Sequence, residues 1–220
     1  MSATATIGIL WLAFAVTHVV LSSVRLRPRL IGVLGERPYL GLYSAVALLL
    51  FVPLVSVYFD NKHAGPALWY LGGATTVRWL GMAGMGVAFV LAVGGLLRPS
   101  PASLAPGRTE VAGALRITRH PLLMGFGLMG LMHLLMAPVN ASDLVFFGGF
   151  PVFALIGCRH QDLRKLHSAG EKLQRFYAET PFLPFSRRGW PRGITEMPVA
   201  LVVGIALAVV IRSFHDTLFG

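Results

Sequence analysis

Six apolar windows run through this sequence and restrict what it can fold into. They lie at residues 4–24, 39–59, 78–97, 121–137, 143–158 and 197–214. A helix needs about 20 predominantly apolar residues to cross roughly 30 Å of hydrocarbon. Only helices or closed barrels span a bilayer, because every backbone polar group there must find a partner. We therefore predict an all-α fold, a polytopic membrane helix bundle with six transmembrane helices.

The composition agrees with a single integral membrane domain over residues 1–220. Hydrophobic residues make up 55% of the chain, charged residues only 13%, and the mean hydropathy is +0.69, a balance unusual for a water-soluble domain. The first window lacks a preceding basic segment and a clear cleavage site, so we expect it to be retained as a span. The single cysteine, Cys158, excludes an internal disulfide and a multi-cysteine metal site. We expect it to be a small residue at a helix end.

The net charge of +10 follows the predicted topology. Sixteen of the 19 Lys and Arg residues fall in three segments, 25–37, 98–119 and 159–192, which are alternate loops of a six-span chain. By the positive-inside rule these loops are cytoplasmic. This predicts a bacterial inner-membrane protein with both termini on the non-cytoplasmic side. Anionic lipid accounts for the basic excess, so we expect membrane lipids as partners and no nucleic acid.

Two connecting segments have amphipathic character. The loop from Arg98 is rich in Pro, Ser and Ala, and it leads into a short interfacial helix that ends at Pro121. Residues 159–196 carry apolar residues such as Leu173 and Phe176 at near-helical spacing, interrupted at Gly170 and ended by the prolines of TPFLPF. We expect this second segment to form an interfacial amphipathic helix before the last span, with its apolar face toward the membrane.

His18 and His133 each fall inside a predicted span, with apolar neighbours on every helical face. Ionisable groups are costly in hydrocarbon and usually functional there. Either each neutral imidazole donates one hydrogen bond to a backbone carbonyl, or the two bind a metal, since imidazole is a good ligand for haem iron, copper and zinc. We expect no buried carboxylate in any span to act as a proton-relay partner, which favours metal ligation. The two positions differ in predicted depth by about 8–10 Å.

Two glycines precede His133 on the same helical face. Gly127 and Gly130 remove side-chain bulk where a flat macrocycle would approach the helix. Close packing between two helices needs the same small residues. The sequence leaves both interpretations open.

A cationic cluster lies directly before the fourth window. It consists of Arg116, Arg119 and His120, followed by Pro121 at the first turn of the predicted helix. A helix N-terminus with positive side chains suits an anion such as a haem propionate, a phosphate or a carboxylate. The arginines also fit a positive-inside anchor.

Several motifs occur in a fixed order along the chain. They are RLIGVLGERPYLGLYSAVALL, the histidine of the first span, TRHPLLMGFGLMGLMHLL, DLVFFGGFPVFALIG and TPFLPF. Together they resemble the NnrU family, membrane proteins named for a link to bacterial nitrite and nitric oxide reduction. The resemblance covers about residues 8–186 and leaves the last span, 197–214, as an addition.

The family resemblance implies a cofactor and an activity. The family includes plant and cyanobacterial isomerases of 15-cis-zeta-carotene, which carry a b-type haem held by two histidines. By position those ligands match His18 and His133, and the family's HP histidine matches His120. The resemblance thus implies haem b, a lipophilic substrate and a redox-dependent cis–trans isomerisation of a polyene, or an accessory role in nitrite and nitric oxide metabolism. A redox partner is a further expectation, and the oligomeric state stays open.

A second resemblance points to membrane methyltransferases of the isoprenylcysteine and phospholipid type. RHPLLMG is followed about 35 residues later by RHQDLRKLHSAGEKLQRFYAETPFLPF. In those enzymes an RHP motif and a Glu-Glu pair shape the S-adenosylmethionine pocket. Here the pair reads Gln161 and Asp162, with Glu171 or Glu179 as substitutes. A non-catalytic assembly or transport helper without a cofactor is the third alternative.

Overall fold

The computed structural model describes residues 1–102, 109–167, 170–215 and 217, and these are mostly helical with almost no strand. The predicted all-α class is confirmed. In chain order the elements are α1 (Ala3–Leu21), α2 (Leu26–Leu34), α3 (Glu36–Asp60), β1 (Ala67–Trp69), α4 (Thr75–Leu97), α5 (Ala114–Ile117), α6 (Pro121–Met136), β2 (Val139–Asn140), α7 (Ala141–Leu166), α8 (Glu171–Glu179), α9 (Trp190–Thr195) and α10 (Pro198–Ser213).

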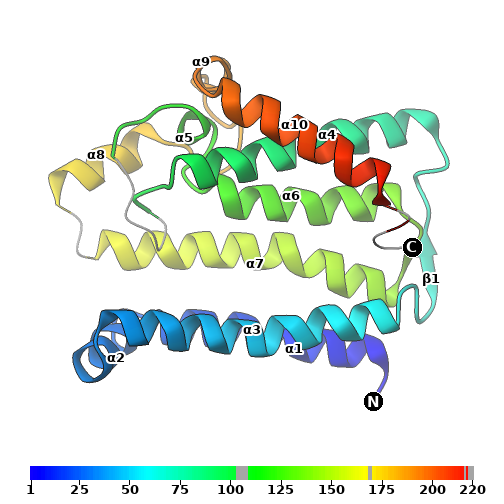
Figure 1. The fold of residues 1–220 in the computed structure, drawn as a ribbon, viewed down its shortest axis with the longest axis horizontal. Helices are drawn as coiled ribbons and strands as arrows, with labels where there is room; N and C mark the ends of the chain where they lie inside the picture. Colours follow the sequence, from blue (N-terminus) through cyan, green and yellow to red (C-terminus); the bar gives the residue numbers. More distant parts are fainter. Residues whose placement is uncertain (103–108, 168–169, 216, 218–220) are drawn as a thin grey trace.

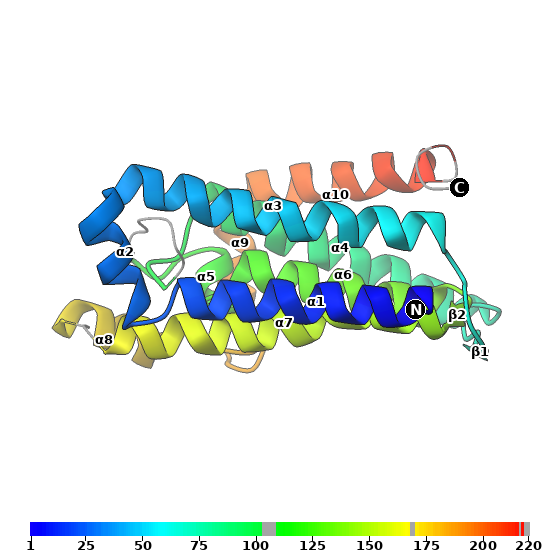
Figure 2. The ribbon, with the colours of Figure 1, turned by 90° about the horizontal axis from the view of Figure 1, so that it is seen from below.

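The long helices lie side by side along one axis, with α7 in the middle of the bundle (Figure 1). Helix α7 contacts α1, α3 and α6, while α4 packs against α6 and α10 packs against α4. The view turned by 90° shows the same common axis (Figure 2). Both termini lie at the end of the bundle that carries β1, and α2 and α8 lie at the opposite end. We refer to these as the β1 end and the α8 end.

Four helices are long and apolar enough to cross a membrane, namely α1, α3, α4 and α7. They correspond to four of the six predicted windows. The other two apolar helices, α6 and α10, have 16 residues each, or roughly 24 Å of helix, which is short for a span. The chain is therefore a multi-pass membrane protein, and the count of six spans stays a prediction.

The structure corrects the end of the fifth predicted span. We expected it to end at Cys158, but α7 continues without a break to Leu166, because neither Gly nor Pro interrupts this stretch. The predicted break at Gly170 does separate α7 from α8.

The side chain of Phe176 on α8 is 1% exposed and packs against Ala102 and Leu115. The apolar face of α8 is thus turned to the protein itself, because the α5 segment offers it an apolar partner.

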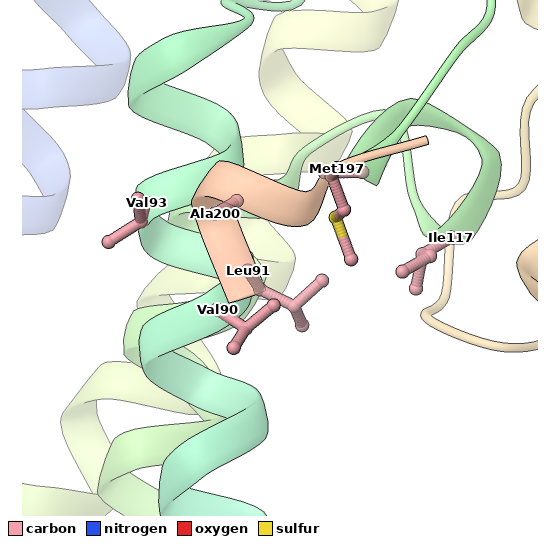
Figure 3. Packing of buried hydrophobic residues seen from close by; sticks show 7 residues of the cluster. Val90, Leu91, Val93, Ile117, Met197 and Ala200 are labelled. Atoms are coloured by element: carbon pink, nitrogen blue, oxygen red, sulfur yellow. The ribbon is translucent and has the colours of Figure 1, made fainter. Parts of the chain in front are cut away.

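Small residues let α4 approach its neighbours closely. A Cβ added at Gly81 would lie 2.1 Å from the Met136 side chain, and one at Gly204 would lie 2.7 Å from the backbone of Val90. Such small-residue contacts are a common way to join helices in membranes. Figure 3 shows the resulting apolar cluster, in which side chains of α4, α10 and the α5 segment meet: Val90, Leu91, Val93, Ile117, Met197 and Ala200.

The α6–α7 connection is a tight hairpin through residues 137–140. Val139 and Asn140 pair with β1, and Asn140 and Asp143 form a capping box at the start of α7. Asp143 also accepts a hydrogen bond from the Tyr58 hydroxyl on α3 at 2.9 Å. The β1 end is thereby held together by the first turn of α7.

Glu196, which directly follows α9, links α9 to the residues of α5 and its N-terminal cap. Its carboxylate accepts hydrogen bonds from Arg116 Nε at 2.8 Å, from the Gly113 amide at 2.9 Å and from Arg192 Nε at 2.7 Å. The bond from the Arg116 guanidinium is the largest cause that lowers the pKa of Glu196 from 4.5 to about 2, and the bonds from Gly113 and Arg192 add to it. The carboxylate is therefore more acidic in the folded protein than in the unfolded chain.

This pKa shift predicts a pH dependence of stability. The ionised Glu196 stabilises the fold fully above its unfolded pKa, and this contribution is lost as the pH falls through the folded pKa, a window of about pH 4.5 to about pH 2. We expect the melting temperature of the wild type to fall more steeply across this window than that of Glu196→Gln, followed by circular dichroism in mild detergent. Glu110→Gln is the control, because Glu110 pairs with Arg98 at an exposed position. Parallel curves for wild type and Glu196→Gln would contradict the prediction.

Candidate functional site

A buried ionic cluster lies at the α8 end of the bundle. Asp162 near the end of α7 accepts a hydrogen bond from Arg119 Nε at 2.9 Å, and its other oxygen lies 2.7 Å from His120 Nε2. The side chains of Asp162 and His120 are both 1% exposed, and that of Arg119 is 15% exposed. Charges this far from water are stable only when they are paired, so the three groups form one unit.

The residues around Pro121 and the TPFLPF stretch hold this cluster in place. The Arg119 amide donates to the Pro181 carbonyl at 2.9 Å, and its guanidinium donates to the Thr180 carbonyl at 2.9 Å. The same guanidinium lies over the rings of Tyr177 and Phe182, 5.1 and 5.2 Å from their centroids, which favours a cation. The chain after α8 therefore closes over the start of α6.

Burial is the main cause that raises the pKa of the Tyr177 hydroxyl, and the Asp162 charge raises it further. Tyr177 is consequently a neutral hydrogen-bond donor at any physiological pH. Its hydroxyl is buried and has no hydrogen-bond partner among the described residues.

The predicted cationic cluster is divided between two carboxylates. Arg116 pairs with Glu196 at 2.8 Å, while Arg119 and His120 pair with Asp162. Each of the three side chains thus already contacts a carboxylate of the chain itself. Their predicted role toward a haem propionate or another anion stays a prediction, and the structure does not gather them around one empty position.

Two buried carboxylates lie within α7, where we expected none in any span. Asp143 and Asp162 are both 1% exposed, one at each end of the helix. Each is surrounded by donors from other elements, which explains how a charged group is tolerated there. The prediction that no span contains a buried carboxylate was therefore wrong. Neither aspartate contacts His18 or His133.

His18 lies near the end of α1 that faces the α8 end. Its Nδ1 is 3.0 Å from the Phe14 carbonyl, one turn earlier in the same helix. The ring packs among those of Phe14, Tyr43 and Phe153, with centroids 4.1, 5.0 and 5.3 Å away. A hydrogen bond from Nδ1 to a carbonyl fixes the tautomer that leaves Nε2 as the free nitrogen.

His133 has the same local arrangement near the opposite end of the bundle. Its Nδ1 is 2.9 Å from the Met129 carbonyl, and its ring stacks on that of Phe147 at 4.2 Å. The ring of His215, which follows α10, lies 6.4 Å away. The packing of α10 on α4 brings His215 to His133.

The structure does not bring His18 and His133 together. Helices α1 and α7 run in the same direction, and the ring of His18 lies 5.3 Å from that of Phe153, so His18 is level with about Phe153 of α7. His133 is level with Phe147. About six residues of helix, or roughly 9 Å, separate the two levels. Two nitrogen ligands at metal–nitrogen distances of about 2 Å would lie about 4 Å apart.

These contacts do not place the two imidazoles on one iron, and their shared ligation of haem b stays a prediction. Each imidazole is nevertheless prepared for a ligand, because its Nδ1 is already hydrogen-bonded to a carbonyl. The described residues contain no group of three or more His, Cys, Asp or Glu side chains that could hold a metal ion.

This separation predicts that the two histidines act independently. We expect the destabilisation of the double variant His18→Ala/His133→Ala to equal the sum of the two single effects within about 0.5 kcal/mol, as for sites more than 7–10 Å apart. Thermal unfolding in mild detergent measures it, with visible spectra taken on the same samples. A haem-type absorbance band lost equally in both single variants, with no further effect in the double variant, would contradict the prediction and indicate a shared iron.

Gly127 and Gly130 bring α6 against α7. A Cβ added at Gly130 would lie 2.4 Å from the Phe147 carbonyl oxygen, and one at Gly127 would lie 3.1 Å from the Ala154 Cβ. Of the two interpretations left open by the sequence, close helix packing is the one that this geometry shows. A role of either glycine beside a macrocycle stays a prediction.

The residues of the methyltransferase alternative lie in two separate places. Asp162 belongs to the buried ionic cluster, and the side-chain oxygen of Gln161 is buried without a hydrogen-bond partner among the described residues. Glu171 and Glu179 line a cavity of 340 Å³ beside α8, together with Lys172 and Arg175. Binding of S-adenosylmethionine stays a prediction.

These features define an integral membrane helix bundle with a buried His–Asp–Arg cluster at one end and two separate imidazoles in its apolar part. Residues 7–220 match the model of the family described as NnrU protein, and the chain belongs to this family. The match includes α10, so it extends beyond the motifs of residues 8–186.

Two curated relatives are both called 15-cis-zeta-carotene isomerase, chloroplastic. The chain is 27% identical to the Zea mays protein over 190 residues, which is 81% of this chain and 49% of that protein. It is 27% identical to the Arabidopsis thaliana protein over 181 residues, 80% of this chain and 48% of that protein. The chain thus spans about half the length of the curated relatives it matches. No solved structure matches the chain.

Proposed function

We propose that this protein is a membrane-embedded isomerase that interconverts cis and trans double bonds of a long, apolar polyene. The observation that carries the proposal is the likeness of about four fifths of the chain to two proteins called 15-cis-zeta-carotene isomerase. A carotenoid-like substrate dissolves in the bilayer, so the enzyme must receive it from the lipid phase.

The bundle offers a surface suited to such a substrate. Leu49 on α3 and Val202 on α10 are 73% and 70% exposed, as expected for helices that face lipid. Between α1, α3 and α7 lies an aromatic cluster with Trp11, Phe51 and Phe150 in edge contact. His18 borders this cluster. Its Nε2 has no partner among the described residues, so we place His18 nearest to the reacting polyene.

The proposal also includes the orientation of the protein in the membrane and its accessory roles. We place the α8 end on the cytoplasmic side of a bacterial inner membrane, because the basic segments gather there. Helices α6 and α10 then complete six spans, which agrees with both termini lying at the β1 end. A haem, a redox partner and a role accompanying nitrite or nitric oxide reduction are further proposals that the resemblance implies.

The proposal is tested by supplying the purified protein in lipid nanodiscs with 15-cis-zeta-carotene in the dark, with and without a reductant. Chromatography separates the isomers. We expect the 15-cis isomer to decrease with wild-type protein and its conversion to fall strongly in His18→Ala. The matched control His167→Ala changes an exposed histidine in the turn after α7 and should leave conversion unchanged. Folded wild-type protein that leaves the isomer ratio unchanged under both conditions would reject the proposal.

A further inference from the structure

Two arginines at the α8 end have buried side-chain nitrogens without a hydrogen-bond partner among the described residues. They are Arg164, with Nε and Nη2 unpartnered, and Arg27, with Nε unpartnered. Arg164 is only 9% exposed. A buried, unpaired guanidinium is costly, so these donors require an explanation that the ionic cluster around Asp162 does not give.

The helix geometry places these donors around one region. His160 on α7 meets Ser22 at the end of α1, and Arg164, one turn further along α7, lies on the same face. It is therefore directed past the end of α1, where α2 begins. Arg27 on α2 lies there, with its guanidinium 5.6 Å from the centroid of the Tyr39 ring.

The region is positively charged. The charges of Arg27 and Arg164 are close enough to repel each other, and Lys165 adds a third positive charge. Within the described residues neither Arg27 nor Arg164 forms an ion pair. Asp162 is near in sequence, but its two oxygens are taken by Arg119 and His120.

We propose that Arg27 and Arg164 bind a phosphate-type oxyanion at the α8 end. Guanidinium groups bind phosphate oxygens through paired, charge-assisted hydrogen bonds. A phosphate group has enough oxygens to satisfy several donors at once. Because α2 and the end of α7 lie where a bilayer has its headgroups, the phosphate comes from an anionic lipid or from a soluble phosphate compound.

The test compares wild type with Arg164→Met, which keeps most of the side-chain volume but removes the charge. Both proteins are purified in dodecyl maltoside, a detergent without phosphate, in a phosphate-free buffer. They are measured alone, with phosphatidylglycerol added to the micelles, and with inorganic phosphate or pyrophosphate added to the buffer. In detergent alone, Arg164→Met should melt at the same temperature as wild type or higher, because an unpaired buried charge has been removed. An added anion should raise the melting temperature of wild type and reverse this order.

Titration of the anion then gives its apparent affinity. We expect Arg164→Met and Arg27→Gln each to weaken it by about tenfold or more, the loss of one charge-assisted bond. Arg27→Gln also keeps the test decisive should Arg164→Met fail to fold. The matched controls Arg159→Gln and Arg29→Gln remove exposed arginines from the same two helices and should bind as wild type does.

The outcomes separate the two sources of phosphate. A response to phosphatidylglycerol alone identifies a lipid headgroup, and a response to inorganic phosphate or pyrophosphate identifies a soluble ligand. The proposal is overturned if none of these anions stabilises the wild type, or if both site variants respond to them as strongly as the two control variants.

Discussion

Replacing Asp162 with alanine is expected to lower the free energy of unfolding by about 3–5 kcal/mol, the cost of removing one partner from a buried ion pair. The carboxylate is 1% exposed and accepts from both Arg119 and His120. Without it the guanidinium of Arg119 loses its counter-ion, and the buried His120 ring loses its hydrogen-bond acceptor. Thermal or denaturant unfolding in mild detergent, followed by circular dichroism, measures the loss.

A matched control and a compensating variant make this prediction specific. Arg159→Gln changes an exposed charge on the same helix and should alter stability by no more than about 0.5 kcal/mol. Replacing Asp162, Arg119 and His120 together with apolar residues of similar volume should recover much of the loss, since it leaves no unpaired charge behind. A loss below about 1 kcal/mol for Asp162→Ala would show that water reaches the cluster and that the three paired side chains contribute little to stability.

The helices could be predicted from the sequence because apolar composition is a local property. The six windows coincide with α1, α3, α4, α6, α7 and α10, and the break at Gly170 was also found. The error at the end of α7 has a simple cause. The window ended where polar residues begin at Arg159, but a helix continues through polar residues until a breaking residue or a cap stops it.

The partners of the charged residues could not be predicted, because they depend on which segments meet in space. Arg119 and His120 were recognised as a cationic group, yet Asp162 was considered only as half of a carboxylate pair for a different enzyme class. One signal was present: an acidic residue at the end of an apolar helix needs a cation at the same depth, and His120 begins the neighbouring helix of the same hairpin. Glu196 and Arg116, 80 residues apart, offered no such clue.

The two histidines show what can be estimated about depth in the membrane by counting residues. Counting residues from the span ends gave a separation of about 8–10 Å along the membrane normal, and the ring contacts with Phe153 and Phe147 on α7 correspond to roughly 9 Å. The sequence therefore indicated that His18 and His133 differ in depth. It could not show that α7 lies between α1 and α6 and fills the space between these helices with phenylalanine rings. Counting residues predicts the depth of a side chain in the membrane. Which helices lie next to each other depends on how they pack and cannot be counted from the sequence.

The second large effect is expected at the other end of α7, where Asp143→Ala should destabilise the protein by about 2–4 kcal/mol. The change leaves the Tyr58 hydroxyl, buried on α3, without its acceptor, at a cost of about 1–3 kcal/mol. It also removes the bond of 2.8 Å from the Asn140 amide that forms half of the capping box, worth about 1 kcal/mol. The ion pair with His63 adds little, because the His63 side chain is 52% exposed.

Two further variants separate these contributions. Tyr58→Phe removes the hydroxyl, so in that background Asp143→Ala should cost only about 1 kcal/mol, the value of the cap. His63→Ala should be almost neutral, because an exposed ion pair contributes little. Since Asp143 and Asp162 lie at opposite ends of a helix of 26 residues, their effects should add within about 0.5 kcal/mol. An Asp143→Ala variant as stable as wild type, or one whose cost is unchanged in the Tyr58→Phe background, would show that the first turn of α7 does not fasten α3 to the bundle.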